Sequence, residues 1–410
     1  MKILVQKFGG TSLARQEDRQ RVARRVVGAK EAGFNVVVVV SAMGRGGDPY
    51  ATDTLLDLIR GMGAEADPRE LDLIASCGEI ISAVIMASTI RSMGHEVCAL
   101  SGGRAGIITD ANFTDARILR VEPDRVLADL KLGKVVVVAG FQGETEQGDV
   151  TTLGRGGSDT TAAALGAALG AEAIEIFTDV DGIKTADPRL VPEARTLKVI
   201  SYDEISQLAH EGAKVIHPRA VDIAMRNNIP LRIRGTFDDS PGTLVTHTFE
   251  AKDRWPEFRE TRVITGVTYV PDMARVVVEI EDAEDEGRLE LEIFRALAEA
   301  GISVDVINVS PGVKSFGIAE TDADKAREVL EGRGLPIRVS VTLQCAKVSV
   351  VGAGMRGLPG VMANVVEALH DTGVKILQTA DSHVTISCLI MQDDLRKAVQ
   401  ALHKKFNLDT

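Results

Sequence analysis

The chain has 410 residues, of which 45% are hydrophobic and 26% are charged, and its net charge is −12. This length is enough for two or three domains with well-formed cores, and the acidic balance argues against nucleic acid or an anionic membrane as the main partner. The cysteines form no CxxC pair and no metal-ligand spacing, which favours reduced core cysteines and a cytoplasmic protein.

The first segment, from Met1 to Ser12, reads MKILVQKFGGTS. Its apolar residues predict a buried strand, which leads into Lys7 and then Gly9 and Gly10. Glycines at a strand exit let the backbone approach a ligand closely, and the start of the next helix favours anions. Since Lys7 adds a mobile positive charge, the segment predicts a phosphate-binding turn. The alternative is a tight turn with an exposed lysine.

Valine-rich strands alternate with amphipathic helices up to about residue 245. This alternation predicts a largely parallel sheet with helices on both faces, and a ligand site at the carboxyl ends of its strands. The apolar runs are far shorter than the roughly 20 residues of a membrane span, so we expect no membrane partner. The expected strands are 3–5, 36–40, 97–100, 135–139 and 174–178, and the expected helices are 17–32, 70–91 and 158–169.

Residues 246–262 lose this periodicity and are charged, which predicts a linker. Beyond them the sequence repeats with an offset of 72 residues, since Gly301 matches Gly373 and Lys325 matches Lys397. Each copy reads strand, helix, strand, strand, helix, which is typical of ferredoxin-like units. The elements are expected at 275–280, 289–299, 303–306, 315–319 and 322–330 in the first copy, and at 347–351, 361–370, 375–378, 384–391 and 393–404 in the second. A doubled small unit suggests sensing or pairing, although a duplicated scaffold without a ligand has the same pattern. The expected domains are therefore 1–245, 263–340 and 345–407.

Gly352, Gly354 and Gly357 match the dinucleotide fingerprint G-x-G-x-x-G between an expected strand and an expected helix. The equivalent positions of the other repeat carry no glycines. We therefore do not expect an NAD site there.

A second glycine-rich loop, TTLGRGGSDTT at 151–161, leads into the helix expected near Ser158. Arg155 offers a planar fork to a carboxylate, and Asp159 in the first helical turn could hold an ammonium group. This pair suits a zwitterion, and hence an amino acid. Glu79 lies in a mostly apolar run, where its pKa rises unless a cation is near. A substrate amine or a structural arginine would both serve.

Further polar residues follow expected strands or supply positive charge. Ser41 follows the valine run 36–40, and Thr178 and Asp179 follow the strand at 174–178. Lys214, in the segment GAKVIHP, is a second candidate cation for phosphates.

The chain carries seven motifs in this order: KFGGTS (7–12), VSAMG (40–44), GE (78–79), FQG (141–143), TTLGRGGSDTTA (151–162), TDVDGIKTADPR (178–189) and GAKVIHPRA (212–220). The same order is found in aspartate kinases, so the sequence resembles that family over essentially the whole chain, and most closely its single-function bacterial members. The resemblance implies an α/β amino-acid-kinase fold followed by two ferredoxin-like βαββαβ ACT domains. It also implies transfer of the ATP γ-phosphoryl to the side-chain carboxylate of L-aspartate, giving 4-phospho-L-aspartate for lysine, diaminopimelate, threonine and methionine synthesis.

The resemblance assigns site residues by motif position. The catalytic residues would be Lys7, Lys214 and Asp159. The aspartate-binding residues would be Ser41, Thr52, Glu79, Arg155, Ser158 and Asp159. The ATP-binding residues would be Lys7, Phe8, Gly9, Gly10, Ser41, Thr178, Asp179, Lys184, Asp187, Pro188 and Arg189. Because a carboxylate substrate is already ionised at neutral pH, such a site needs no general base and depends on positioning and charge neutralisation.

Under this resemblance Mg²⁺ would be bound to the ATP phosphates, because the motifs suggest no dedicated metal site on the protein. A feedback inhibitor (lysine, threonine or diaminopimelate) would bind the ACT domains, with Asp285 and Asn308 as candidate contacts. The ACT domains would also pair the chain into a homo-oligomer. Two alternatives stay open: a kinase of another carboxylate such as glutamate or carbamate, and an amino-acid-sensing regulatory protein with an inactive kinase domain.

Overall fold

The structure is a computed structural model that describes residues 1–61, 66–213, 215–247, 263–280, 285–355 and 357–409. Lys214 and nearly all of the expected linker 246–262 lie outside these residues. The chain divides into two compact units, which are described separately. The first comprises Met1–Ile183, Thr196–Ala209 and Lys214–Arg259, and the second comprises Lys184–Arg195, His210–Ala213 and Glu260–Thr410. Two short segments from the expected first domain, 1–245, therefore pack with the second unit.

The first unit is built on an eight-stranded sheet in which the pairing is parallel except between β11 and β12. Valine-rich strands lie at its centre because both faces are covered. In spatial order the strands are β10 (Val199–Ser201), β12 (Thr243–Thr246), β11 (Leu231–Gly235), β9 (Ala173–Thr178), β1 (Ile3–Phe8), β2 (Asn35–Val40), β6 (Val135–Ala139) and β3 (Val97–Leu100).

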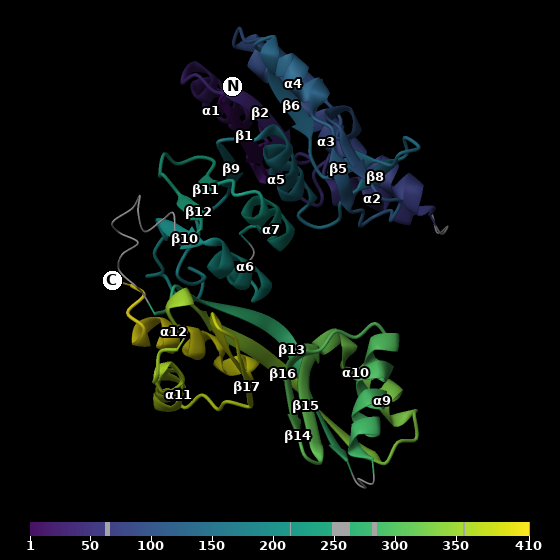
Figure 1. Cartoon of the computed structure of the whole chain (residues 1–410), viewed down its shortest axis with the longest axis vertical. Coiled ribbons are helices and arrows are strands. Elements are labelled where there is room, and N and C mark those ends of the chain that lie inside the picture. The colour runs from purple at the N-terminus through teal and green to yellow at the C-terminus, as the bar shows by residue number, and fades with distance from the viewer. Residues whose placement is uncertain (62–65, 214, 248–262, 281–284, 356, 410) are drawn as a thin grey trace. The chain divides into compact units, whose positions relative to one another are not determined.

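Helices cover this sheet on both faces, as Figure 1 shows. A helix pair, α1 (Gln16–Glu31) and α3 (Pro68–Ser92), packs over β2, and α5 (Gly157–Leu169) packs against β1, β2 and β9. The remaining helices of the unit are α2 (Thr52–Arg60), α4 (Asp124–Lys131), α6 (Tyr202–His210) and α7 (Pro218–Arg226). A smaller sheet has the order β5 (Ile118–Val121), β4 (Ile107–Thr109), β7 (Gln142–Glu144) and β8 (Val150–Thr152).

Helix α3 is long and apolar enough to cross a membrane by length and composition, and among the described residues it alone meets that test. Half of its most apolar stretch is buried inside the unit, where Ala83, Met86 and Ile90 join the core under β2. Its buried face also carries the carboxylates of Asp72 and Glu79. These contacts are those of a core helix.

The second unit is a six-stranded sheet with two helices over each half, and Figure 1 shows β13 and β16 passing from one half into the other. The sheet order is β14 (Asp305–Ser310), β15 (Val313–Ala319), β13 (Gly266–Ile280), β16 (Ile337–Val351), β18 (Thr385–Met391) and β17 (Gln378–Asp381). The helices are α9 (Glu286–Glu299), α10 (Ala323–Glu331), α11 (Val361–Asp371) and α12 (Leu395–Lys405).

Strands β13 and β16 each serve both halves of this sheet. The end of β13 pairs with β15 and with the start of β16, whereas residues 266–270 pair with 347–351 at the end of β16. Both strands turn at the crossover, where Asp272 and Gln344 have positive φ. Each half thus has the ferredoxin-like strand arrangement, but the second half takes its fourth strand from residues 266–270. The halves are therefore interleaved and do not follow the contiguous ranges expected from the repeats, 263–340 and 345–407.

The helices of the repeats lie close to their expected positions, whereas several strands differ from them. Strands β13 and β16 begin at Gly266 and Ile337, well before the expected 275–280 and 347–351, and β14 spans Asp305–Ser310 in place of 303–306. Strand β17 begins at Gln378, where the sequence predicts a strand over 375–378. The two halves have separate cores, one around Phe316 and Ile293 and the other around Val348 and Leu369.

Candidate active site

The turn after β1 is packed closely against the loop after β2. A Cβ on Gly10 would lie 2.4 Å from the Ala42 carbonyl oxygen, so only glycine fits. The Gly44 amide donates to the Gly10 carbonyl (2.9 Å), and the Ser41 amide donates to the Phe8 carbonyl (3.2 Å). Two of the predicted phosphate-site segments are thereby joined at the carboxyl end of the sheet.

The aromatic residue of this turn belongs to the core. The Phe8 ring is fully buried and stacks on Phe177 with centroids 4.6 Å apart. Beside it, Ser12 and Thr236 share a buried hydroxyl hydrogen bond of 2.7 Å, and the Thr236 amide donates to the Thr178 carbonyl. Because its ring is enclosed, Phe8 can contribute only backbone atoms to the nucleotide site predicted for it.

Lys7 and Asp159 form an ion pair at the same edge. Lys7 Nζ lies 2.8 Å from Asp159 Oδ1, and the two side chains are 14% and 12% exposed. Asp159 occupies the first turn of α5, which begins after Gly156 in a left-handed conformation (φ 68°). The pair places a cation between the end of β1 and a helix N-terminus, an arrangement suited to phosphate groups. Ser158, in the same helical turn, is buried against Gly140.

Glu79 presents a buried carboxylate near this edge. The side chain belongs to α3 and is 2% exposed; its Oε1 accepts from the Ala42 amide (3.1 Å), and its Oε2 has no hydrogen-bond partner among the described residues. Burial raises the pKa of Glu79 to about 7, although the Ala42 amide and the nearby Thr52 side chain favour the ionised form. A cation placed beside Oε2, whether a substrate amine or an arginine, would therefore restore full ionisation.

The glycine-rich loop before α5 is held by residues that the sequence analysis did not single out. Arg219 forms an ion pair with Asp115 (3.0 Å) and donates to the Leu153 carbonyl (3.2 Å). The His217 ring fills the space beside Gly156, where a Cβ would lie 2.2 Å from it. The loop is thus anchored on one side, while the Arg155 guanidinium within it is exposed and makes no contact with the described residues that would tie it down.

Asp72 is a second buried carboxylate that the sequence analysis missed. It accepts from the Thr114 amide, the Thr152 amide (2.9 Å) and the Thr152 hydroxyl (2.6 Å). These bonds fix β8 immediately before the glycine-rich loop. Since Asp72 lies seven residues before Glu79 on one helix, helical periodicity places both on the same face, and this spacing was the available signal.

The residues predicted for nucleotide binding are divided between the two units. Thr178 is the last residue of β9 and Asp179 follows it; Asp179 forms an ion pair with Arg45 (3.0 Å) that is largely exposed. Lys184, Asp187, Pro188 and Arg189 belong to the second unit. There Asp187 binds Arg189 (2.6 Å) and accepts from the Tyr269 hydroxyl (2.9 Å).

Comparison with known proteins gives consistent matches over the whole chain. The profile of the amino acid kinase family matches residues 2–235, and an ACT domain profile matches residues 340–404. Aspartokinase 1 of Bacillus subtilis is 48% identical over 408 residues, covering 100% of both chains. The aspartokinase of Corynebacterium glutamicum is 42% identical over 420 residues, covering 100% of this chain and 97% of that one.

Since these relatives match over essentially their whole length, the chain belongs to the aspartokinase family. Among solved structures, E. coli aspartokinase III in complex with aspartate and ADP matches with a TM-score of 0.79 at 25% identity, covering 98% of this chain and 99% of that one. The same enzyme in complex with lysine and aspartate matches with a TM-score of 0.75 at 26% identity, covering 99% and 100%. These matches confirm the predicted fold class, an amino-acid-kinase fold followed by ACT domains, and the resemblance on which it was based.

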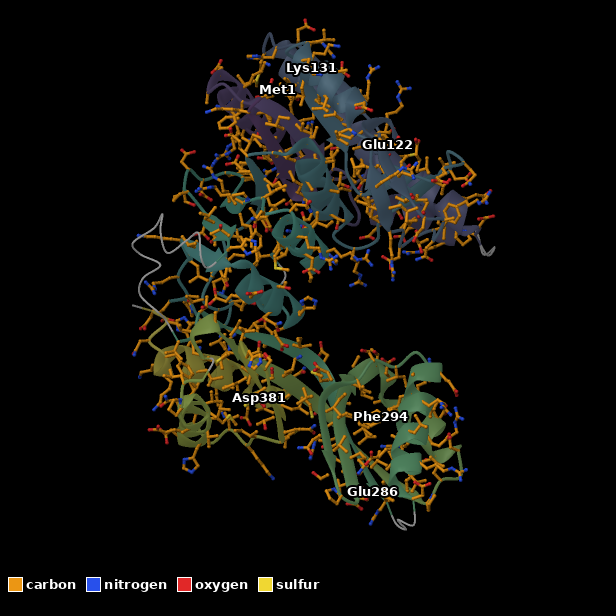
Figure 2. The ribbon with its side chains drawn as sticks, viewed as in Figure 1. Met1, Glu122, Lys131, Glu286, Phe294 and Asp381 are labelled. Atoms are coloured by element: carbon orange, nitrogen blue, oxygen red, sulfur yellow. The ribbon has the colours of Figure 1, made fainter. Side chains whose placement is uncertain are left out.

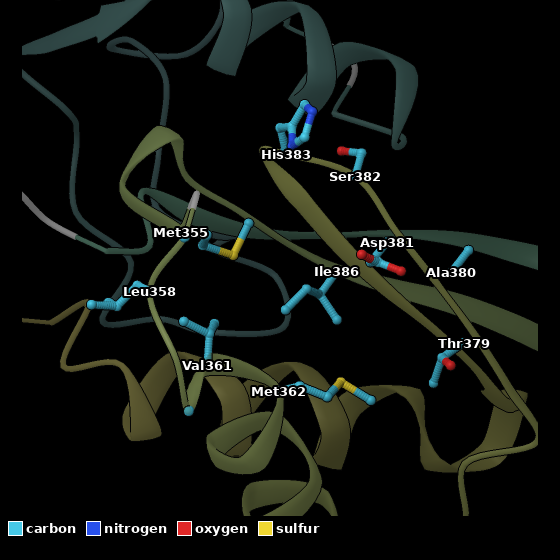
Figure 3. Close-up of a pocket in the computed structure, with 12 residues that line it drawn as sticks. Met355, Leu358, Val361, Met362, Thr379, Ala380, Asp381, Ser382, His383 and Ile386 are labelled. Atoms are coloured by element: carbon cyan, nitrogen blue, oxygen red, sulfur yellow. The ribbon is translucent and has the colours of Figure 1, made fainter.

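As an aspartokinase, the chain has its regulatory features in the second unit. The second ACT half contains a cavity of about 460 Å³. Figure 3 shows residues that line it, among them Met355, Val361, Met362, Ile386, Asp381 and His383. Gly357 and Gly360, both with positive φ, line the same cavity. Gly357, the third glycine of the G-x-G-x-x-G pattern, therefore lines a cavity of the second ACT half.

The two candidate effector residues, Asp285 and Asn308, lie in the first ACT half. Figure 2 labels Glu286 and Phe294, which belong to helix α9 of the same half. Asp285 caps α9 by accepting from the Arg288 amide (3.0 Å), and Asn308 in β14 accepts from the Ser310 hydroxyl (3.0 Å). Both side chains are therefore engaged locally. Lys314 is buried close by, with Glu286 and Glu290 at 2.5 and 2.7 Å.

Proposed function

We propose that this aspartokinase transfers the γ-phosphoryl group of ATP to the β-carboxylate of L-aspartate, giving 4-phospho-L-aspartate and ADP. The observation that carries the proposal is the Lys7–Asp159 ion pair, which puts a cation beside a helix N-terminus at the carboxyl edge of the sheet. Solved relatives support the substrates, because E. coli aspartokinase III has been crystallised with aspartate and ADP.

The reaction needs charge neutralisation and alignment more than proton transfer. A carboxylate oxygen of aspartate attacks the γ-phosphorus, the bond to the β,γ-bridging oxygen breaks, and ADP carries away the electron pair. Lys7, Gly9 and Gly10 would bind the transferring phosphoryl group, and Asp159 would hold the Lys7 ammonium at the strand end. By motif position Lys214 would neutralise the same phosphates.

The aspartate substrate would be bound by groups of opposite charge. The exposed Arg155 guanidinium suits the α-carboxylate as a two-pronged donor, and Glu79 and Asp159 suit the α-ammonium group. Ser41, Thr52 and Ser158 would complete the polar wall of this pocket. This division of charge is supported by the free Oε2 of Glu79, which lacks a hydrogen-bond partner among the described residues.

The nucleotide would be bound by Thr178, Asp179 and the segment from Lys184 to Arg189. Mg²⁺ would be bound with ATP as part of the substrate. A triphosphate offers the hard oxygen ligands that Mg²⁺ prefers, and the ion usually keeps few protein ligands at such sites.

Regulation would use the second unit, with lysine, threonine or diaminopimelate as feedback inhibitor. The complex of E. coli aspartokinase III with lysine and aspartate supports an amino-acid effector. Strand β14 forms an edge of the regulatory sheet and exposes Ile307 and Val309, which supports homo-oligomerisation through the ACT domains. We place the enzyme in the cytoplasm, in the biosynthesis of lysine, threonine and methionine.

The test is a hydroxamate assay, in which hydroxylamine traps the acyl phosphate formed from MgATP and L-aspartate. We expect colour that requires aspartate and is suppressed by one of the three effectors added singly or in pairs. Colour with glutamate or carbamate instead would keep the fold and change the substrate. MgATP binding without turnover on any carboxylate would favour the regulatory protein with an inactive kinase domain.

A further inference from the structure

Residues 266–270 of β13, which pair with β16 in the second ACT half, contact two segments that the family motifs assign to ligand binding. The Val267 amide donates to the Thr185 carbonyl (2.8 Å), and the Tyr269 hydroxyl donates to Asp187 (2.9 Å). Between them, the Thr268 hydroxyl donates to the Glu211 carbonyl (3.0 Å). Three consecutive residues of a regulatory strand thus contact the nucleotide motif and the segment that directly precedes Lys214.

Both segments are also fixed by packing. Ala186, Val191 and Ala194 are buried in the core of the second ACT half, together with Val267 and Val348. The other segment approaches so closely that a Cβ on Gly212 would lie 2.1 Å from the Tyr269 carbonyl oxygen. Their conformation is therefore set by the regulatory sheet, since neither segment has room to shift while that sheet keeps its shape.

The Glu211 side chain is held by a buried lysine. Lys347 in β16 is 5% exposed at its side chain, and its Nζ lies 3.0 Å from Glu211 Oε2, which also accepts from the Ser349 hydroxyl (2.6 Å). The second carboxylate on Lys347 is Asp305, the first residue of β14. Because a buried ammonium group is stable only with its partners in place, movement of either carboxylate affects the other through Lys347.

We propose that Tyr269 and Lys347 are positioning residues for nucleotide binding: Tyr269 holds Asp187 and its partner Arg189, and Lys347 holds Glu211. The proposal rests on the proposed function, which assigns Asp187 and Arg189 to the ATP site. It also gives β14 a connection to catalysis, since Asp305 shares Lys347 with Glu211 and the candidate effector contact Asn308 lies on the same strand.

The sharpest test is Tyr269→Phe in the full-length protein, which removes one hydroxyl and keeps the ring. Loss of a single hydrogen bond of about 1 kcal/mol corresponds to a roughly fivefold change in an equilibrium constant. We expect the Kd of MgATP, measured by titration calorimetry, to rise about fivefold, with the Kd of aspartate unchanged. The KM of MgATP should rise in parallel while kcat stays within twofold.

Tyr202→Phe is the matched control, because it removes a buried tyrosine hydroxyl that donates to the Ile229 carbonyl in the first unit. This variant should change the melting temperature without a selective effect on MgATP. An unchanged MgATP Kd in Tyr269→Phe, or an equal loss of aspartate and MgATP affinity, would overturn the role of Tyr269. Because binding is measured directly, a wild type that binds MgATP but makes no acyl phosphate contradicts the proposed function alone.

Asp305→Asn tests the connection through Lys347. Without effectors its MgATP KM should rise no more than that of Tyr269→Phe, because Glu211 still pairs with Lys347. With lysine, threonine or diaminopimelate added singly, the inhibitor that acts on the wild type should need at least a threefold higher concentration for half inhibition. Wild-type inhibition by that compound would overturn the connection, whereas the Tyr269 result would stand.

Discussion

The residues proposed for phosphoryl transfer and the segment 184–189 of the predicted nucleotide site are stabilised by different parts of the molecule. Lys7, Glu79 and Asp159 are held by contacts inside the first unit, through an ion pair and the Ala42 amide. The segment from Thr185 to Arg189 is instead held by β13 of the regulatory sheet. A change in the regulatory unit should therefore act first on MgATP affinity and leave the phosphoryl-transfer geometry intact.

Replacement of Lys7 should have the largest effect, and it should appear in kcat. Lys7→Ala removes the cation that pairs with Asp159 at the end of β1, and we expect kcat to fall about 10²–10³-fold, as for loss of one transition-state donor. Steady-state kinetics with the hydroxamate assay measure this. A kcat within threefold of the wild type would show that Lys7 has no role in phosphoryl transfer.

Replacement of Arg155 should act on aspartate and not on MgATP. The guanidinium is exposed and forms no ion pair within the part of the chain that the structure describes, so its removal should not disturb the fold. A charge-assisted hydrogen bond made equally in ground and transition states appears in KM. We expect the aspartate KM to rise about 10–100-fold in Arg155→Ala. Arg104→Ala, another exposed arginine of the first unit, serves as the control. A selective rise in the MgATP KM would reverse the orientation of the two substrates.

The sequence predicted five of the eight strands in the main sheet of the first unit because their signals are local, but it did not predict β10, β11, β12 or the smaller sheet. The expected strands at 97–100 and 135–139 coincide with β3 and β6, because short apolar runs rich in β-branched residues and bounded by polar turns indicate buried strands. Lys7, Glu79 and Asp159 were each identified from their immediate neighbours. The raised pKa expected for an unpaired Glu79 is also found, because burial in an apolar helix face is readable from composition.

What the sequence did not reveal depends on pairing between distant residues. The sequence predicts a strand over 275–280, but β13 begins at Gly266, because residues 266–270 are stabilised by β16 in the other half of the sheet. In the same way nothing local marks 184–195 as part of the regulatory core, where Ala186 and Val191 are buried. Interleaving of the two halves follows from tertiary contacts, and the repeat pattern alone suggests contiguous units.

The pH dependence of aspartate binding should report on Glu79. Its pKa is raised from 4.5 to about 7, so the carboxyl group is protonated in the free protein at pH 6 and must ionise to pair with an ammonium group. We expect the aspartate KM to rise about tenfold from pH 8 to pH 6, with the MgATP KM less affected. Glu79→Gln should abolish this dependence, and a dependence that survives it would assign the titration to another group.

The raised pKa of Glu79 also makes the free energy of unfolding depend on pH. Because the folded-state pKa of Glu79 lies above its ordinary value of 4.5, the folded protein binds this proton more tightly than the unfolded chain. Its contribution to the free energy of unfolding is therefore greatest below pH 4.5 and is lost as the pH rises through about 7. Bound aspartate should reverse that loss.

The smallest effects are expected for substitutions in the second unit near the predicted nucleotide segment. They test most directly whether that segment and the phosphoryl-transfer residues are stabilised separately. The buried hydroxyl of Thr185 is hydrogen-bonded to His403 of α12 (2.9 Å), so Thr185→Val removes a contact made wholly inside the regulatory unit while keeping the side-chain shape. We expect the MgATP KM to rise about two- to fivefold with kcat and the aspartate KM unchanged. Ser349→Ala, which instead removes a hydroxyl bonded to Glu211, should give a similar MgATP-selective change if both segments position the nucleotide. An effect on kcat in either variant would mean that the regulatory sheet also controls the chemistry, and that the two sides of the site are not separately stabilised.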